Sequence, residues 1–267
     1  MSPRPGSAGR PAGTIAWYQE TLQGEIAAGA TRVRGVGEVD FGSTPAQWAE
    51  WARFESVINE ALAQWPLWGV CMYDTRVLPD AVVRAGQRTH PQLMTATERT
   101  ANPRYMDPTD FLRSMPAAGP DPLESTPPVI HVPDLTNLAD LRRQVHRACL
   151  AGSAVPKDAV AEFVYAINEV ATNAVVHGRS PVSVRLWTSA DRLLCTVTDR
   201  GTGFSDPLAG YLPGSLDVGV GSDADVARHG RGLWLARRLS DHVDAARTAD
   251  GFSVRVVTGL PRGHRLV

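Results

Sequence analysis

The stretch INEVATNAVVHG, residues 167–178, decides the fold of the second half of the chain. Its apolar residues recur at helical spacing, and the same pattern continues upstream to Phe163. Pro156 suits the first turn of such a helix, and His177-Gly178 suits its end. We therefore expect one long helix with a buried face between about residues 156 and 178.

Two polar residues interrupt the apolar pattern of this helix. Glu169 and Asn173 are four residues apart, so their side chains leave the same face about one turn apart. A carboxylate can accept a proton from an attacking hydroxyl, and an amide oxygen can ligate Mg²⁺. Alone the pair is weak evidence for function, because a polar stripe that faces solvent has the same spacing.

A second motif, DRGTG at residues 199–203, directly follows a predicted strand over Leu193–Thr198. Asp199 at a strand end can accept a hydrogen bond from an exocyclic amine such as that of adenine. Gly201 and Gly203 let the backbone turn with positive φ and come close to a flat base. Asp and Gly are also ordinary turn residues, so this motif alone leaves a simple turn open.

A third motif, RHGRGL at residues 228–233, opens another predicted helix. The free N–H groups and the positive dipole end of a helix N-terminus bind phosphate, and Gly230 and Gly232 lie at that terminus. Arg228 and Arg231 add cations suited to a polyphosphate. Each motif is weak alone, but the three occur in one order, each in the local structure it needs. Together they favour a nucleotide site.

The elements around these motifs define the fold class of residues 134–267. Their predicted order is helix, helix, strand, strand, loop, helix, strand, strand, with Asp250-Gly251 as the turn of the last hairpin. That order predicts an α/β domain built as a two-layer sandwich with a largely antiparallel sheet.

The rest of the chain divides into three parts. Residues 1–13 are rich in Pro, Gly, Ser and Arg and are expected to form a disordered tail. Residues 14–115 alternate predicted helices with short apolar strands, which indicates a smaller α/β domain. Residues 116–133 contain six prolines and are expected to form an extended linker.

Composition narrows the classes of function. The 267-residue chain has a formal charge of −1 and 43% hydrophobic residues, which is ordinary for a globular protein. Near-neutral charge gives no electrostatic case for direct nucleic-acid binding. The three cysteines form no Cys-x-x-Cys pair, and no apolar run is long enough to span a membrane. We expect a cytoplasmic protein that binds neither nucleic acid nor membrane.

The three motifs resemble the N-box, G1 box and G2 box of the GHKL ATPase superfamily, in particular of bacterial anti-sigma-factor serine/threonine kinases. This resemblance implies a Bergerat-type α/β sandwich that binds ATP with Mg²⁺. It implies that Glu169 is the base that activates a partner's hydroxyl, that Asn173 holds Mg²⁺ and that Asp199 reads adenine. The remaining implied nucleotide contacts are His177, Gly178, Gly201, Gly203, Arg228, Gly230, Arg231 and Gly232, and residues 204–227 would form the ATP lid.

The resemblance also implies partners. Such kinases phosphorylate a STAS-domain anti-anti-sigma protein, bind a sigma factor, control transcription by partner switching and usually form homodimers. Two alternatives stay open: a nucleotide-dependent binding module that transfers no phosphate, and an ATPase fragment of a sensor histidine kinase. The second is disfavoured because Arg147 follows His146 and Pro91 follows His90, so neither offers the usual phospho-accepting pattern.

Four segments of the first part resemble the MEDS sensory domain. They are residues 29–38, residues 54–60, CMYD at residues 71–74 and RTHP at residues 88–91, with NPRY at residues 102–105 fitting the tail of that domain. The matching sequence starts only near Thr14, which implies a truncated domain. Either the domain is degenerate or the start codon is misplaced, and no ligand is assigned to it.

Overall fold

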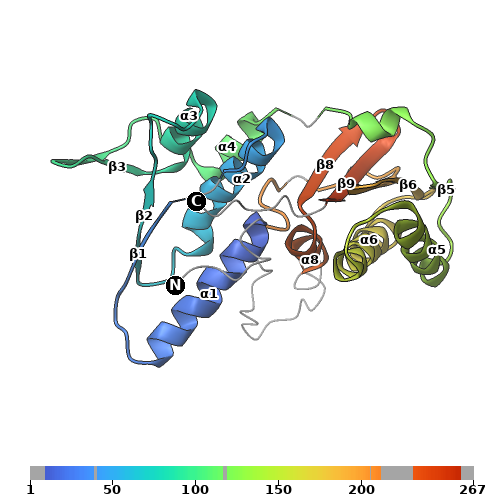
Figure 1. The fold of residues 1–267 in the computed structure, drawn as a ribbon, viewed down its shortest axis with the longest axis horizontal. Helices are drawn as coiled ribbons and strands as arrows, with labels where there is room; N and C mark the ends of the chain where they lie inside the picture. Colours follow the sequence, from blue (N-terminus) through green and yellow to red (C-terminus); the bar gives the residue numbers. More distant parts are fainter. Residues whose placement is uncertain (1–9, 39–40, 117–118, 205, 212–230, 260–267) are drawn as a thin grey trace. The chain divides into compact units, whose positions relative to one another are not determined.

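The computed structural model describes residues 10–38, 41–116, 119–204, 206–211 and 231–259 (Figure 1). The chain forms two compact units. The first comprises Met1–Pro116 with Asp206–Leu212, and the second comprises Ala117–Ser205 with Pro213–Val267. Among the described residues, no helix has both the length and the apolar character needed to cross a bilayer.

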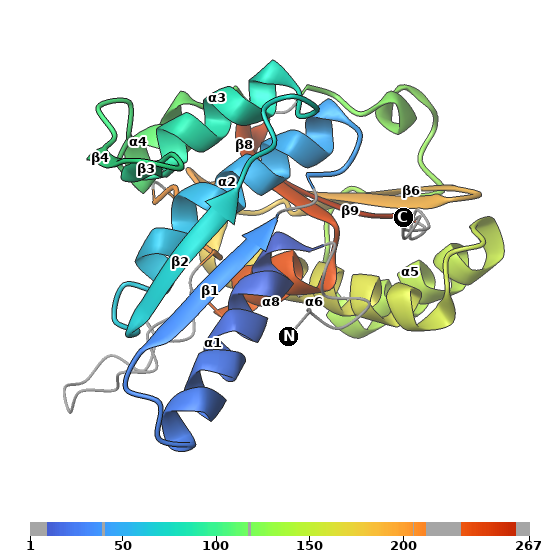
Figure 2. The same cartoon turned by 60° about the vertical axis from the view of Figure 1, so that its left-hand side comes forward.

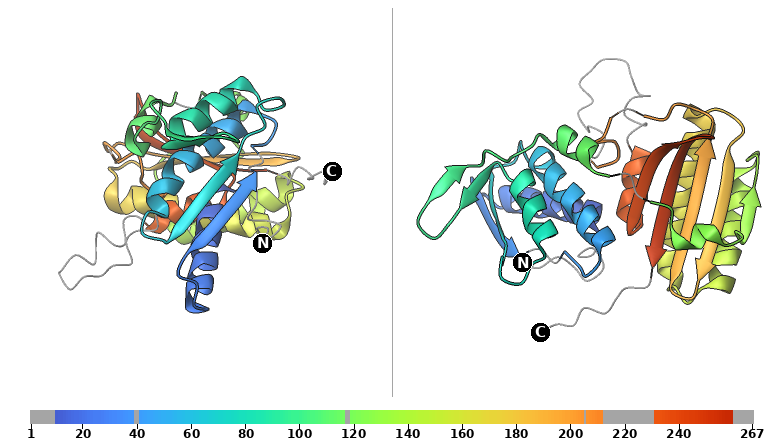
Figure 3. Two further views of the ribbon diagram at one scale, coloured as in Figure 1. Left: turned by 90° about the vertical axis from the view of Figure 1, so that its left-hand side faces the viewer. Right: turned by 90° about the horizontal axis from the view of Figure 1, so that it is seen from above.

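The second unit has two layers, as the sequence predicts. One layer is a sheet in which every neighbouring pair of strands is antiparallel. Its order is β5 (Ile130–Val132), β6 (Ser183–Ser189), β7 (Arg192–Asp199), β9 (Gly251–Gly259) and β8 (His242–Thr248). The other layer, on one face of this sheet, holds α5 (Leu138–Gly152), α6 (Lys157–His177) and α8 (Arg231–Leu239) (Figure 3). The predicted fold class is therefore confirmed.

The core of this unit lies between the helices and the sheet. Leu186, Cys195 and Val256 face one another across β6, β7 and β9, and all three are fully buried. On α6, Phe163 and Ile167 are buried as well. The apolar period of residues 163–174 therefore fixes which face of α6 turns toward the sheet, and with it where the polar residues of the helix lie.

The opposite face of the sheet is covered by part of the stretch predicted as a linker. A 3-10 turn, η1 (Pro122–Ser125), places Leu123 on an apolar cluster of Trp187, Leu194 and Val257. The Trp187 indole donates a hydrogen bond to the Thr126 carbonyl oxygen over 2.8 Å. Residues 122–132 thus contain both η1 and the edge strand β5.

Three arginine contacts attach this covering segment to the sheet. Arg192 pairs with Asp121, with Nη2 2.5 Å from Oδ2. Arg255 pairs with Glu124, with Nη2 2.7 Å from Oε2, and also donates from Nη1 to the Gly119 carbonyl oxygen over 2.9 Å. The attachment therefore begins at Gly119.

The first unit packs helices against a short parallel ribbon (Figure 2). Strands β1 (Val33–Glu38) and β2 (Leu67–Met72) pair in parallel, as expected when a helix joins them. The other elements are α1 (Pro11–Ala27), α2 (Pro45–Ala61), α3 (Asp80–Thr89), the hairpin β3 (Gln92–Met94) and β4 (Arg99–Ala101), and α4 (Pro108–Ser114). Helix α1 begins at Pro11, inside the stretch predicted as a tail, and residues 1–9 lie outside the described part of the chain.

The core of the first unit is rich in aromatic side chains. It includes Trp51, Phe54, Phe41 and Ile15, and Thr44 starts α2 with a reciprocal capping box to Gln47. Tyr211 is 3% exposed in this same core, and Leu208 packs against it. Residues 206–211 therefore belong structurally to the first unit, although they follow β7 in sequence.

Candidate nucleotide site

Helix α6 carries the first two candidate residues. Glu169 and Asn173 are half-buried on the same face of the helix, whereas Val170, Ala171 and Ala174 between and beside them are buried. The helix is therefore fixed by its apolar side while its carboxylate and amide remain accessible. This placement is what a base and a metal ligand require, since both must reach a substrate.

Helix α8 brings the third motif to these two residues. Helices α6 and α8 pack side by side (Figure 1). Gly232 lies in the first turn of α8, where an added Cβ would come within 2.9 Å of Asn173 Nδ2 and 3.2 Å of Glu169 Oε2. Because Gly232 has no side chain, the start of α8 approaches Glu169 and Asn173 without displacing their side-chain ends. Helix starts in general have backbone N–H groups without intrahelical partners, and such groups bind phosphate.

Asp199, at the end of β7, organises the second motif. Its Oδ1 accepts hydrogen bonds from the Gly201 N–H over 2.6 Å and from the Arg179 N–H over 3.2 Å. Asp199 is 7% exposed. An added Cβ on Gly178 would lie 2.4 Å from the Asp199 carboxyl carbon, and one on Gly201 would lie 2.6 Å from Oδ1. The carboxylate therefore fits only because both neighbours lack side chains.

The glycine loop after Asp199 is shaped by the last hairpin. Gly203 has a positive φ of 65°, and a Cβ there would lie 2.1 Å from the Phe252 ring. Phe204 stacks edge-on against Phe252 with ring centroids 5.0 Å apart. The loop thus packs on the Phe252 ring, while Thr202 and Gly203 remain exposed.

Gly251 is a positioning residue that the sequence analysis treats only as a hairpin turn. Its φ is 138°, and an added Cβ would lie 2.0 Å from the Asp199 carbonyl oxygen. The Asp-Gly turn signal indicates a hairpin but not its contact with β7. Only the pairing of Asp199 with Phe252 in the β7–β9 ladder reveals it.

We expect Gly251→Ala to lower the free energy of unfolding by ~2 kcal/mol, because a non-glycine residue is strained at this φ and its Cβ meets backbone. The affinity for a nucleotide bound beside Asp199 should fall roughly tenfold as this carboxylate is displaced. Chemical denaturation and calorimetry measure the two effects. Gly119→Ala is the control, because an added Cβ there has no atom within 4 Å. Unchanged affinity in a destabilised Gly251→Ala protein would contradict the positioning role.

The remaining predicted contacts are less defined. His177 is exposed at the end of α6. Arg231 begins α8, but the position of its side chain is not described. Arg228, Gly230 and most of the predicted lid, residues 205 and 212–227, lie outside the described residues. The structure therefore brings together Glu169, Asn173 and Gly232, and separately Gly178, Asp199 and Gly201.

Comparison with known proteins gives two family matches and a set of similar solved structures, of which one is described below. Residues 132–258 match the model of the histidine kinase-like ATPase domain, and residues 3–91 match the MEDS (methanogen/methylotroph, DcmR) sensory domain. The MEDS match starts nearer the N-terminus than the expected Thr14. No curated protein matches the chain.

The solved structure contains the RsbU and RsbW domains of Rv1364c from Mycobacterium tuberculosis. It matches at 20% identity with a TM-score of 0.34, over 51% of this chain and 32% of that chain. This chain thus spans about a third of that relative. The two family matches cover the three nucleotide-site motifs and the four MEDS-like segments up to residue 91, but not residues 102–105. The chain therefore carries a MEDS sensory domain followed by a histidine kinase-like ATPase domain of the GHKL type.

Proposed function

We propose that the second unit binds ATP with Mg²⁺ and phosphorylates a serine or threonine of a STAS-domain anti-anti-sigma protein. The observation that carries this proposal is the approach of Gly232 to both Glu169 and Asn173. It places a helix start, a metal-type ligand and a carboxylate at one point, which are the parts that phosphoryl transfer needs.

Different residues of the chain would bind different parts of the Mg²⁺–ATP complex. Asp199, held by two backbone N–H groups, would accept a hydrogen bond from the adenine amine, and Gly201 and Gly203 would let the base approach. Asn173 would supply an amide oxygen to Mg²⁺, which prefers oxygen ligands. The start of α8 would bind phosphate, together with Arg228, Gly230 and Arg231.

Glu169 would act on the partner's hydroxyl. ATP, when bound, supplies the γ-phosphoryl group and a good leaving group. The carboxylate of Glu169 is half-buried and faces the start of α8, so it can orient the hydroxyl and accept its proton as the oxygen attacks. Positioning and charge stabilisation then provide most of the acceleration, as is general for phosphoryl transfer.

The proposal extends to a regulatory circuit. The ATPase domain would bind a sigma factor. Phosphorylation of the STAS protein would decide whether the ATPase domain binds that protein or the sigma factor. The chain would work in the cytoplasm, as a homodimer, without direct contact with nucleic acid or membrane.

We expect Asn173→Ala to weaken Mg²⁺-dependent ATP binding by roughly tenfold or more, and to weaken metal-free binding much less, since only the metal-bound state uses its oxygen. Calorimetric titration with ATP, with Mg²⁺ present or chelated, measures both. Equal loss in the two conditions would show that Asn173 only supports the fold. Asn168→Ala, on the same helix, is the control.

A transfer assay tests the proposal as a whole. The purified chain, Mg²⁺ and γ-labelled ATP are mixed with each STAS-domain protein encoded in the same genome. We expect acid-stable label on one of them, as phosphoserine and phosphothreonine give. Acid-labile label on the chain itself would support the histidine kinase alternative. Confirmed ATP binding with no label on any candidate would support a non-catalytic binding module.

A further inference from the structure

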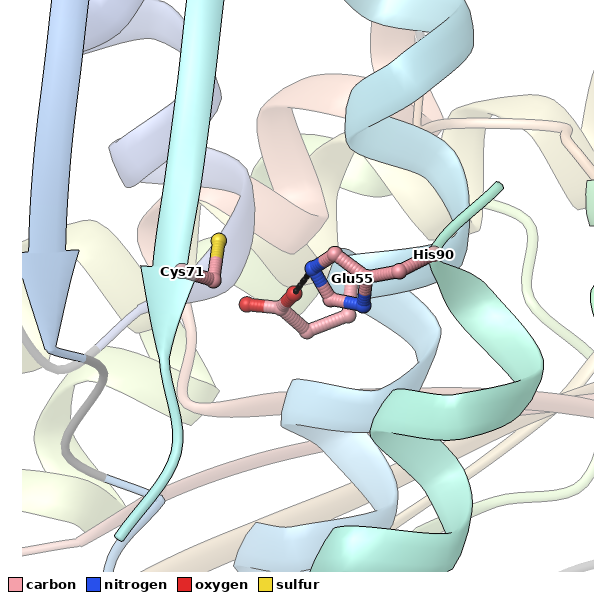
Figure 4. Close-up of side chains that lie close together, drawn as sticks. All are labelled: Glu55, Cys71 and His90. Atoms are coloured by element: carbon pink, nitrogen blue, oxygen red, sulfur yellow. Dashed lines mark ion pairs between the residues drawn. The ribbon is translucent and has the colours of Figure 1, made fainter. Parts of the chain in front are cut away.

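Three ligand-type side chains converge inside the first unit, whereas the nucleotide-site residues belong to the second. Glu55 comes from the middle of α2, Cys71 from β2, and His90 follows the end of α3 (Figure 4). One ligand atom of each lies within 4.8 Å of the other two. The three residues fall in three of the segments that the sequence analysis singles out, residues 54–60, 71–74 and 88–91, to which the proposed kinase activity gives no role.

The carboxylate of Glu55 is incompletely satisfied. Its side chain is 2% exposed, and within the described residues Oε1 is buried without a hydrogen-bond partner. The other oxygen, Oε2, accepts a hydrogen bond from Tyr73 Oη over 3.4 Å and lies 3.2 Å from His90 Nε2. A buried carboxylate oxygen without a hydrogen-bond partner destabilises the folded state unless a cation neutralises the charge.

His90 is oriented as a metal ligand would be. Its Nδ1 lies 2.9 Å from the Gly86 carbonyl oxygen, which can only accept a hydrogen bond, so Nδ1 carries a proton. In the neutral ring this leaves the lone pair on Nε2 for a metal, and without a metal a protonated Nε2 can pair with Glu55 instead. The Tyr73 ring packs edge-on against the imidazole with centroids 5.6 Å apart and fixes its plane. Nε2 is thereby turned toward Glu55 and Cys71 (Figure 4).

The same geometry disfavours a nucleophilic triad. In a Cys–His–Glu relay the thiol and the carboxylate use opposite nitrogens of the imidazole ring. Here the backbone occupies Nδ1, and both Glu55 and Cys71 lie on the Nε2 side (Figure 4). Three ligand atoms within 4.8 Å of one another on that side of the ring fit a coordination site better than a proton relay.

We propose that Glu55, Cys71 and His90 bind one Zn²⁺ ion inside the first unit. Carboxylate, thiolate and imidazole are the donors that Zn²⁺ uses in proteins, and at Zn–N and Zn–O lengths of ~2.1 Å a tetrahedral N···O edge is about 3.4 Å. The observed 3.2 Å between Nε2 and Oε2 is close to that edge. Three protein ligands leave a fourth position for water or a small donor molecule.

The test uses the full-length chain without nucleotide, so that its outcome does not depend on the proposed kinase activity. Metal-free, reduced protein is titrated with Co²⁺, which reports thiolate ligation by a charge-transfer absorption band, and then with Zn²⁺. We expect one Co²⁺ per chain, the charge-transfer band, and stoichiometric displacement by Zn²⁺. Folding is followed by circular dichroism at each step.

Variants locate the site. Cys71→Ser should remove the charge-transfer band, and His90→Gln and Glu55→Gln should weaken Zn²⁺ binding at least ~100-fold. Cys149→Ser is the matched control and should keep both signals. Cys149 lies in the second unit, and burial raises the pKa of its thiol to about 12, which disfavours the thiolate that a metal needs.

Two results would overturn the proposal. One is a folded wild-type chain that takes up no stoichiometric Zn²⁺ and shows no charge-transfer band with Co²⁺; the cluster is then an ion pair beside a thiol. The other is undiminished binding in folded Cys71→Ser and His90→Gln proteins, which would place the metal elsewhere in the chain.

Discussion

Replacing Glu169 by alanine will reduce phosphoryl transfer to the STAS partner by roughly 1,000-fold, as expected for the loss of a general base. ATP affinity should change little, because in the proposed mechanism the carboxylate acts on the partner's hydroxyl. Truncation should also spare the fold, since Glu169 is half-buried and Val170 and Ala171 hold the helix in the core. Single-turnover transfer with γ-labelled ATP measures the rate, and calorimetry measures affinity.

The control for this variant is Glu162→Ala, two turns earlier on α6, which should transfer phosphate at close to the wild-type rate. Comparable loss of ATP binding and transfer in Glu169→Ala would assign Glu169 to the nucleotide pocket. Undiminished transfer would exclude it as the base and favour activation by another residue.

Asp199→Asn should lower ATP affinity by roughly 100-fold, the effect of losing a hydrogen bond to a charged group, which is ~1.5–3 kcal/mol. The amide keeps one oxygen for the Gly201 and Arg179 N–H groups, so the loop is retained. Its NH₂ group would replace the second oxygen and face the adenine amine, donor against donor. Calorimetric titration with ATP measures the change.

Thermal unfolding distinguishes a loss of ATP recognition from a loss of fold stability in Asp199→Asn. The melting temperature of Asp199→Asn without nucleotide should stay close to wild type, and Asp191→Asn, in the turn before β7, should keep full affinity. If Asp199→Asn binds ATP as tightly as wild type, Asp199 has only a structural role in the loop.

Much of the second unit could be predicted from the sequence. The apolar period through Phe163, Ile167 and Val170 predicts both the helix and its buried face, and that face dictates where Glu169 and Asn173 lie. The strand before Asp199 and the Asp-Gly hairpin can be predicted as well. In both, the local apolar pattern and the turn residues indicate the same structure. The two-layer fold class follows from their order.

What the sequence could not predict depends on contacts between distant segments. Gly251 reads as a turn residue, and only the sheet register places it against Asp199. The three ligand-type residues of the first unit are 16 and 19 positions apart in sequence, since 71 − 55 = 16 and 90 − 71 = 19. They meet only because α2, β2 and α3 pack around one point, which no local pattern encodes.

The segment that covers the sheet has a consequence for any isolated ATPase domain. Proline composition suggests a cut near residue 133, and the family match begins at residue 132. Such a fragment would lose β5, which leaves β6 as an unpaired edge, and would expose Trp187, Leu194 and Val257. Open edges and apolar patches promote self-association. A fragment that starts at Gly119 keeps its own cover and should remain monodisperse where the shorter one aggregates.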